Sequence, residues 1–140
     1  MNDAHLHLVI NHFPIIGTLF GLGILITGML LKNNSVKNTA YILFIVAAIF
    51  AAFSMGTGEG AEELVEDLPN IGKQINHEHE EIAEKFAIIM YVTGFLGLLS
   101  LYTSIKNHNL AKIFSFITLA LALLAAVFAK SVGTSGGEIR

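Results

Sequence analysis

The chain of 140 residues contains no cysteine. Disulfides, iron–sulfur clusters, thiolate zinc sites, covalently attached c-type haem and thiol nucleophiles are therefore excluded. Charged residues are also scarce, at 14% of the chain, whereas hydrophobic residues make up 54%. This balance differs strongly from that of a soluble domain, and a net charge of −3 gives no reason to expect nucleic acid as a partner.

Four long apolar runs occupy most of the sequence. Because an α-helix rises about 1.5 Å per residue, each run can cross most or all of a hydrocarbon core about 30 Å thick. The first run lacks the basic flank and the cleavage site of a signal peptide, so we expect it to be retained. We predict an all-α integral membrane protein, a four-helix up-down bundle in one domain over residues 1–140, with spans at 13–31, 39–55, 86–105 and 110–132.

The placement of lysines predicts how these spans are oriented. The short connections 32–37 and 106–112 each carry two lysines close to helix ends, whereas the connection 56–85 is strongly acidic. Because positive charge marks cytoplasmic loops, we expect both termini and the acidic connection on the periplasmic side of a bacterial inner membrane. The acidic connection is expected to be a long outer loop, with Asn76 as the N-cap of the third helix.

Small residues and a repeated motif predict how the helices pack. Glycine, alanine and serine recur in all four runs, and such residues allow helices to approach closely in lipid. We expect two related hairpins about a pseudo-twofold axis along the membrane normal. Glycine-rich segments at 56–60 and 133–137 are expected to end the second and fourth helices. The repeated positions are Phe13, Ile15, Ile16 and Gly21, which correspond at one constant spacing to Phe86, Ile88, Ile89 and Gly94.

The segment Asn11-His12-Phe13-Pro14-Ile15-Ile16, preceded by two further histidines, resembles the opening of the first span in the DUF2231 family of small predicted membrane proteins. Members of that family resemble domains fused to c-type cytochromes. The resemblance therefore implies a redox setting, with other membrane or periplasmic redox proteins as partners and quinone as a further candidate. The remaining points of likeness are Thr57-Gly58 before an acidic stretch, His79-Glu80 at the start of the third helix, and Gly136-Gly137 after the fourth.

Histidines gather at one end of the predicted bundle, and helical periodicity selects a pair among them. Two imidazoles from different helices can hold the iron of a b-type haem, which supports electron transfer. At about 100° per residue, two stripes each combine a histidine with a glycine, as a flat macrocycle between helices would need. The stripes are His12, Leu19 and Gly23 in the first helix and His79, Phe86, Met90 and Gly97 in the third. We therefore expect His12 and His79 as axial ligands of haem b near the outer membrane face.

Two alternative ligand sets remain open. The internal repeat places His79 roughly 9 Å farther out along the bundle axis than His12. His5 or His7 would lie closer to the depth of His79 and would therefore be a better partner for it. His12 could also pair with Met55, at the end of the second span.

A second hypothesis uses overlapping residues to bind Cu, Zn or Fe. His77 and Glu81 share one helix face, and His12 and His79 lie at the same boundary. Oxygen ligands would come from the acidic residues after the second span, namely Glu59, Glu62, Glu63 and Glu66.

A third hypothesis is a structural subunit without a cofactor, whose histidines anchor helix ends and whose carboxylates stay in water. No nucleophile and base are paired in the sequence, so we expect no independent catalytic activity under any of the three hypotheses.

Overall fold

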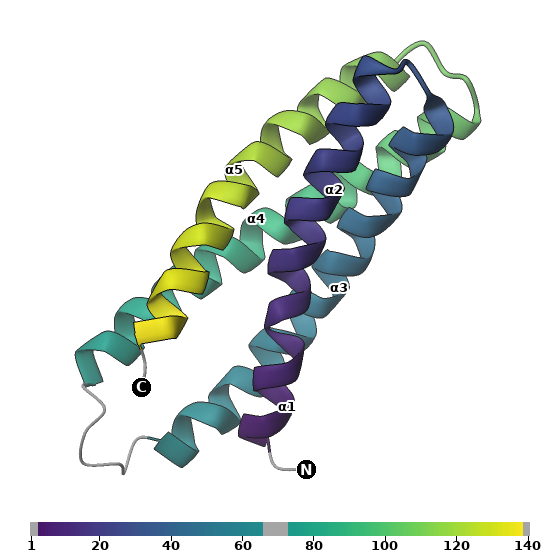
Figure 1. The fold of residues 1–140 in the computed structure, drawn as a ribbon. Helices are drawn as coiled ribbons and strands as arrows, with labels where there is room; N and C mark the ends of the chain where they lie inside the picture. The colour runs from purple at the N-terminus through teal and green to yellow at the C-terminus, as the bar shows by residue number, and fades with distance from the viewer. Residues whose placement is uncertain (1–2, 66–72, 139–140) are drawn as a thin grey trace.

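The computed structural model describes residues 3–65 and 73–138 as long helices packed side by side (Figure 1). Each helix packs on the next in the chain, and α2 also contacts α5, which closes the bundle. The prediction of an all-α, up-down four-helix bundle is therefore confirmed, with the short α1 extending α2 outward. The helices are α1 (Asp3–Ile10), α2 (His12–Leu30), α3 (Asn34–Val65), α4 (Lys73–Ile105) and α5 (Ala111–Glu138).

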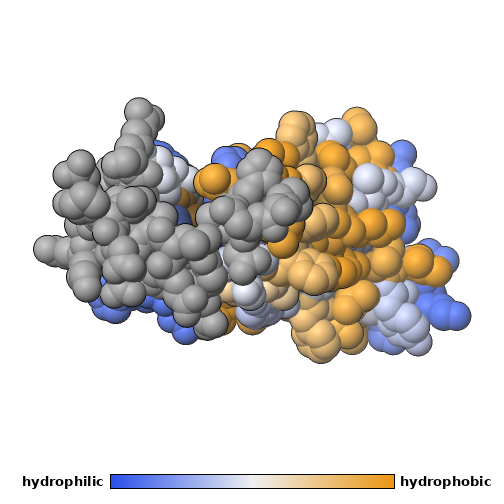
Figure 2. All heavy atoms as spheres, turned by 90° about the horizontal axis from the view of Figure 1, so that it is seen from below, coloured by the Kyte–Doolittle hydropathy of each residue, from blue (hydrophilic) through white to orange (hydrophobic). Residues whose placement is uncertain are grey.

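Within residues 3–65 and 73–138, four helical stretches are long and apolar enough to cross a membrane, as predicted. Large hydrophobic side chains cover their outer surfaces; Phe20, Phe95 and Val127 are each at least 60% exposed. Figure 2 shows these side chains as a broad hydrophobic band with hydrophilic residues beyond it. The protein is therefore an integral membrane protein in contact with the lipid bilayer. The candidate spans are Leu6–Leu30, Asn34–Gly58, His77–Ile105 and Ala111–Gly137.

The two glycine-rich segments do not end their helices, and that prediction is wrong. Helix α3 continues through Gly56 and Gly58, and α5 continues through Gly133 and Gly136. Among the described residues no glycine has a positive φ. A glycine inside a helix costs about 1 kcal/mol relative to alanine, which tertiary contacts can offset. Gly58 and Gly136 make such contacts, as the site geometry shows below.

The acidic connection is also mostly helical, which corrects the prediction of a long outer loop. Helix α3 extends to Val65 and α4 begins at Lys73, so Asn76 lies inside α4 and is not its N-cap. Glutamate and lysine are good helix formers in water, and this explains why the helices continue past their apolar segments. Residues 66–72 lie outside the part of the chain that the structure describes.

The two short connections at the opposite end close both hairpins in the same way. Lys32 and Asn107 each adopt a left-handed conformation, with φ of 51° and 49°. The N–H of Asn33 donates to the Gly28 carbonyl at 2.9 Å, and the N–H of His108 donates to the Thr103 carbonyl at 2.9 Å. These are Schellman motifs, which satisfy carbonyls that a helix C-terminus leaves unpaired. The tight turns hold α2 beside α3 and α4 beside α5.

Small residues lie where the helices come closest. A Cβ atom built on Gly21 would lie 2.7 Å from Cε1 of Phe44, and one built on Gly94 would lie 2.5 Å from Cβ of Ala48. Both distances are too short for a side chain, so the prediction that these glycines allow close packing is confirmed. Gly23 is different, because nothing lies within 4 Å of a Cβ atom at that position.

Buried hydroxyl groups link helices in the half of the bundle near the short connections. Tyr41 Oη lies 2.6 Å from Ser115 Oγ, which joins α3 to α5. Ser100 Oγ lies 2.8 Å from Thr118 Oγ1, which joins α4 to α5. In lipid, such hydrogen bonds add specificity to helix contacts that have no hydrophobic driving force.

Candidate functional site

His7 points into the bundle from α1 and rests against α3. Its Nδ1 lies 3.1 Å from the Ser54 carbonyl oxygen and 3.2 Å from Thr57 Oγ1. Because a carbonyl oxygen can only accept, Nδ1 carries the proton and Nε2 keeps its lone pair. A Cβ atom on Gly58 would lie 3.5 Å from Cε1 of the ring. The ring is therefore half-buried and held in one tautomer, with one nitrogen available to a ligand.

His79 is held in the corresponding way by α5. Its Nδ1 lies 2.8 Å from Ser135 Oγ. The Ser135 hydroxyl also lies 3.1 Å from the Val132 carbonyl oxygen, and both hydrogen bonds form together when Ser135 donates to Val132 and accepts from Nδ1 of His79. Nδ1 of His79 therefore carries the proton, and Nε2 keeps its lone pair. A Cβ atom on Gly136 would lie 3.2 Å from Cε1 of His79, so a side chain at this position in α5 would press on the ring.

The structure brings His7 and His79 to the same depth on diagonal helices. Thr18 Oγ1 lies 3.0 Å from the sulfur of Met90, and this contact across the interior sets the depth of α2 relative to α4. His7 precedes Thr18 by eleven residues, and His79 precedes Met90 by the same number, which is about three helical turns. The two imidazoles lie close enough to interact electrostatically. Of the sequence-based pairings, the structure thus favours His7 with His79.

His12 lies on the outer face of α2, whereas His7 and His79 face the interior of the bundle. Its ring is exposed, and its Nδ1 donates to the Leu8 carbonyl one turn earlier at 2.9 Å. Leu19 is 52% exposed and Gly23 is exposed as well, so the stripe headed by His12 faces outward. The expectation that this stripe faces a macrocycle inside the bundle is therefore wrong. Periodicity groups residues on a stripe but leaves open which stripe is buried.

The stripe headed by His79 does face the interior, with Phe86 and Met90 both buried. Its glycine, however, serves helix packing. A Cβ atom on Gly97 would lie 3.2 Å from the backbone oxygen of Tyr41, so α3 occupies the space that the glycine leaves. Gly97 thus lies at a helix contact, and Gly23 lies on the outer surface. Met55 is half-buried on α3, next to the Ser54 that holds His7.

His77 and Glu81 share an exposed face of α4, as predicted. The ring nitrogens of His77 lie 3.9 Å from Glu80 and 4.0 Å from Glu81. Glu81 also pairs with Lys85 at 3.4 Å, so this is a solvated chain of weak ion pairs. Within the described ranges no three histidine, aspartate or glutamate side chains converge on one point. The side chains of His5, Glu59, Glu62, Glu63 and Glu66 lie outside the described part of the chain.

Asn11 is a site residue that the sequence analysis missed. It joins α1 to α2 and lies four residues after His7, which places both on one helix face. Its Oδ1 atom is buried and has no hydrogen-bond partner. Two other buried oxygens, in Asn38 and Ser104, share this property but belong to the opposite end of the bundle. An unpaired buried acceptor costs about 1–3 kcal/mol, so Asn11 marks a position where a ligand or water would be stabilised.

The fold and site together define a class, namely a four-helix membrane protein in which two of the histidines with described side chains face inward at one end. Comparison with protein-family models, with curated proteins and with solved structures found no match to the chain. The resemblance to the DUF2231 family therefore stays a prediction from the motif at residues 11–16.

Proposed function

We propose that the chain is a membrane-bound b-type haem protein for electron transfer, and that His7 and His79 are the axial ligands. One observation carries the proposal: two half-buried imidazoles from different hairpins lie at the same depth, each with Nδ1 bonded and with no hydrogen-bond partner for Nε2 among the described residues. Ligating histidines in proteins have this arrangement, in which the second nitrogen donates to a carbonyl or hydroxyl oxygen. Two imidazoles are also a complete axial set for haem iron.

The residues around the pair fit such a group. Asn11 and Ala83, each four residues after one of the histidines, continue the two inner faces with a small polar and a small apolar side chain. Beyond them, Phe86 begins a buried apolar cluster. The residues next to the two histidines are thus small, and the interior farther in is apolar, which are the surroundings that a macrocycle between the helices would need.

Neighbouring residues of the chain would orient the two imidazoles and set how strongly they bind the iron. The Ser54 carbonyl and the Ser135 hydroxyl accept from Nδ1 of the two rings, which fixes their tautomers and raises the basicity of Nε2. The buried Phe86 lowers the local dielectric constant, one of the factors that set a reduction potential. When bound, haem would supply a one-electron carrier near the membrane surface.

Absorption spectroscopy of the purified, reduced protein tests this proposal. We expect a split α-band in the wild type, and loss of the low-spin spectrum in His7→Ala and in His79→Ala. His77→Ala is the matched control, because it removes an exposed histidine two residues from His79 on the same helix. If both interior variants keep a low-spin spectrum, the ligand assignment is wrong. A spectrum without haem but with stoichiometric Cu, Zn or Fe would replace the proposal by the metal-binding hypothesis, and absence of both would leave a structural subunit.

We further infer that the histidine end faces the periplasm of a bacterial inner membrane. The lysines at the two short connections support this orientation, because they place positive charge on the cytoplasmic side. Since the chain has no cysteine, single cysteines report orientation directly. In intact cells, Glu80→Cys should react with a membrane-impermeant thiol reagent and Ser35→Cys should not. The reverse labelling pattern would invert the topology.

The proposed partners are other membrane or periplasmic redox proteins, in keeping with the resemblance to the DUF2231 family. On this proposal, electrons would pass between a lipid-soluble carrier and a periplasmic protein at the end of the bundle where His7 and His79 would hold the haem.

A further inference from the structure

The end of the bundle with the short connections carries positive charge and no carboxylate side chain. Neither residues 4–58 nor residues 85–137, which contain these connections, include an aspartate or a glutamate. At the histidine end, by contrast, Lys85 pairs with Glu81 at 3.4 Å. The counter-charge for the lysines at the short connections must therefore come from outside the chain. These lysines are Lys32, Lys37, Lys106 and Lys112.

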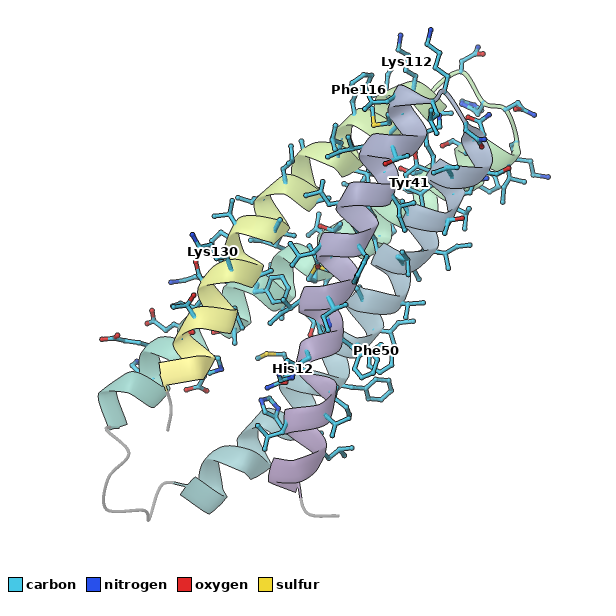
Figure 3. The ribbon with its side chains drawn as sticks, in the orientation of Figure 1. His12, Tyr41, Phe50, Lys112, Phe116 and Lys130 are labelled. Carbon is cyan, nitrogen blue, oxygen red and sulfur yellow. The ribbon has the colours of Figure 1, made fainter. Side chains whose placement is uncertain are left out.

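The lysines lie at the border between the lipid-facing surface and water. Leu31 precedes Lys32 and Ile105 precedes Lys106, and both apolar side chains are more than 60% exposed. Figure 3 shows Lys112 at the end of α5 that adjoins the short connections. Because the headgroup phosphates of a bilayer begin where its hydrocarbon core ends, these lysines are at the level of the phosphates.

The two hairpins contribute lysines at nearly the same depth. Gly94 of α4 lies against Ala48 of α3, and these two helices run antiparallel. Lys106 follows Gly94 by twelve residues and Lys37 precedes Ala48 by eleven, so the two lysines differ little in depth. The stem of Lys37 also packs on α2, because its Cγ lies 2.8 Å from the position of a Cβ atom on Gly28. The charges of the two connections therefore combine in one cationic surface, which we call the lysine surface.

We propose that the lysine surface binds anionic phospholipids, with the phosphate group of phosphatidylglycerol as its ligand. This phosphodiester carries one negative charge, which complements the ammonium groups. Phosphatidylcholine carries a cation beside its phosphate, so its headgroup has no net charge to offer. The acyl chains would lie along exposed apolar residues such as Leu31 and Ile105, which a free phosphate ion would not contact. The proposal does not depend on a bound haem.

Thermal melting of the full chain in an uncharged detergent tests the proposal. We expect phosphatidylglycerol in the micelles to raise the melting temperature, because a ligand of the folded state stabilises it. The same mole fraction of phosphatidylcholine should have little effect. At 1 M salt the effect of phosphatidylglycerol should decrease strongly, since charges are then screened over about 3 Å.

Lys112→Gln and Lys130→Gln are a matched pair of variants. Both lysines are exposed on α5, and Figure 3 shows them toward its opposite ends. Lys112→Gln should weaken the apparent affinity for phosphatidylglycerol about fivefold, the usual effect of one lysine near an anionic membrane surface. Lys130→Gln should leave the affinity unchanged. Without lipid both variants should melt like wild type, since substitutions at exposed positions change stability little.

Several outcomes would overturn the proposal. One is equal stabilisation by the two lipids, and another is an equal loss of affinity in Lys112→Gln and Lys130→Gln. A full effect of inorganic phosphate would assign the lysine surface to a soluble anion instead. Stabilisation by polyglutamate without an effect of the lipid would assign it to an acidic protein partner. None of these outcomes affects the haem assignment, which absorption spectroscopy tests separately.

Discussion

The two ends of the bundle use buried polar groups for different purposes. At the end with the short connections, hydroxyls bond to one another across helices, as Tyr41 does with Ser115. At the other end the interior polar groups are imidazoles, and His7 and His79 each use one nitrogen for a helix contact and keep the other free. The hydroxyl pairs at the short connections join helices to one another and therefore contribute to stability. Under the proposed function, the histidine end binds a ligand, and the unpaired buried oxygen of Asn11 lowers the stability of the same end.

The largest expected effect tests close helix packing, on which both ends depend. In Gly94→Leu the new side chain would collide with Ala48 of α3, where even a Cβ atom lies at 2.5 Å. Such overpacking should destabilise the protein by about 3 kcal/mol, measured as thermal melting in detergent. Gly23→Leu is the matched control, because a side chain there meets nothing within 4 Å. Similar melting of the two variants would contradict the assigned helix faces.

The second prediction affects the histidine end alone. Ser135→Ala removes the acceptor for Nδ1 of His79, so the ring loses its fixed tautomer. We expect haem affinity to fall about 10- to 100-fold, as for other partners of ligating histidines, with little change in melting of the cofactor-free protein. Ser131→Ala, four residues earlier on α5 and exposed, should change neither quantity. A large melting shift in Ser135→Ala would instead show that the contact is structural.

The third prediction concerns the end with the short connections, where a variant should change stability and leave haem binding unchanged. Tyr41→Phe removes the hydrogen bond to Ser115 and keeps the ring, so stability should fall by about 0.6 kcal/mol while the haem spectrum stays unchanged. Tyr102→Phe, which changes a largely exposed tyrosine on α4, is the control. Unfolding in denaturant measures the stability of the two variants, and absorption spectroscopy measures their haem spectra. An altered spectrum in Tyr41→Phe would mean that the two ends are coupled.

The smallest expected effect is a slight gain in stability, whereas the variants above lose stability or haem affinity. Asn11→Leu replaces an unpaired buried oxygen by apolar atoms of similar volume, so the cofactor-free protein should become as stable as wild type or slightly more so. Haem affinity should decrease, because the replaced amide is a polar group available to a ligand. Destabilisation of the cofactor-free protein would show that Asn11 has a structural role.

Sequence patterns were sufficient for the spans and for several packing positions. Apolar runs identify helices in lipid because every backbone group must be satisfied within the helix. Gly21 and Gly94 were predicted as contact residues, since only small side chains allow close approach. The same reasoning failed at 56–60, where glycines suggested a helix end. In α3 these glycines remain helical, and the ring of His7 from α1 lies over one of them, Gly58.

Composition and periodicity alone determined that this chain forms four apolar helices with its histidines mostly at one end. They could not decide which histidine faces inward, because His7 and His12 lie on two different faces of one helix and both faces are apolar farther along. That choice depends on how α2 is rotated against α3 and α4, which is set by the contacts of Gly21 with Phe44 and of Thr18 with Met90. Only the tertiary structure contains these long-range contacts, and they turn His7 toward the interior and His12 toward lipid.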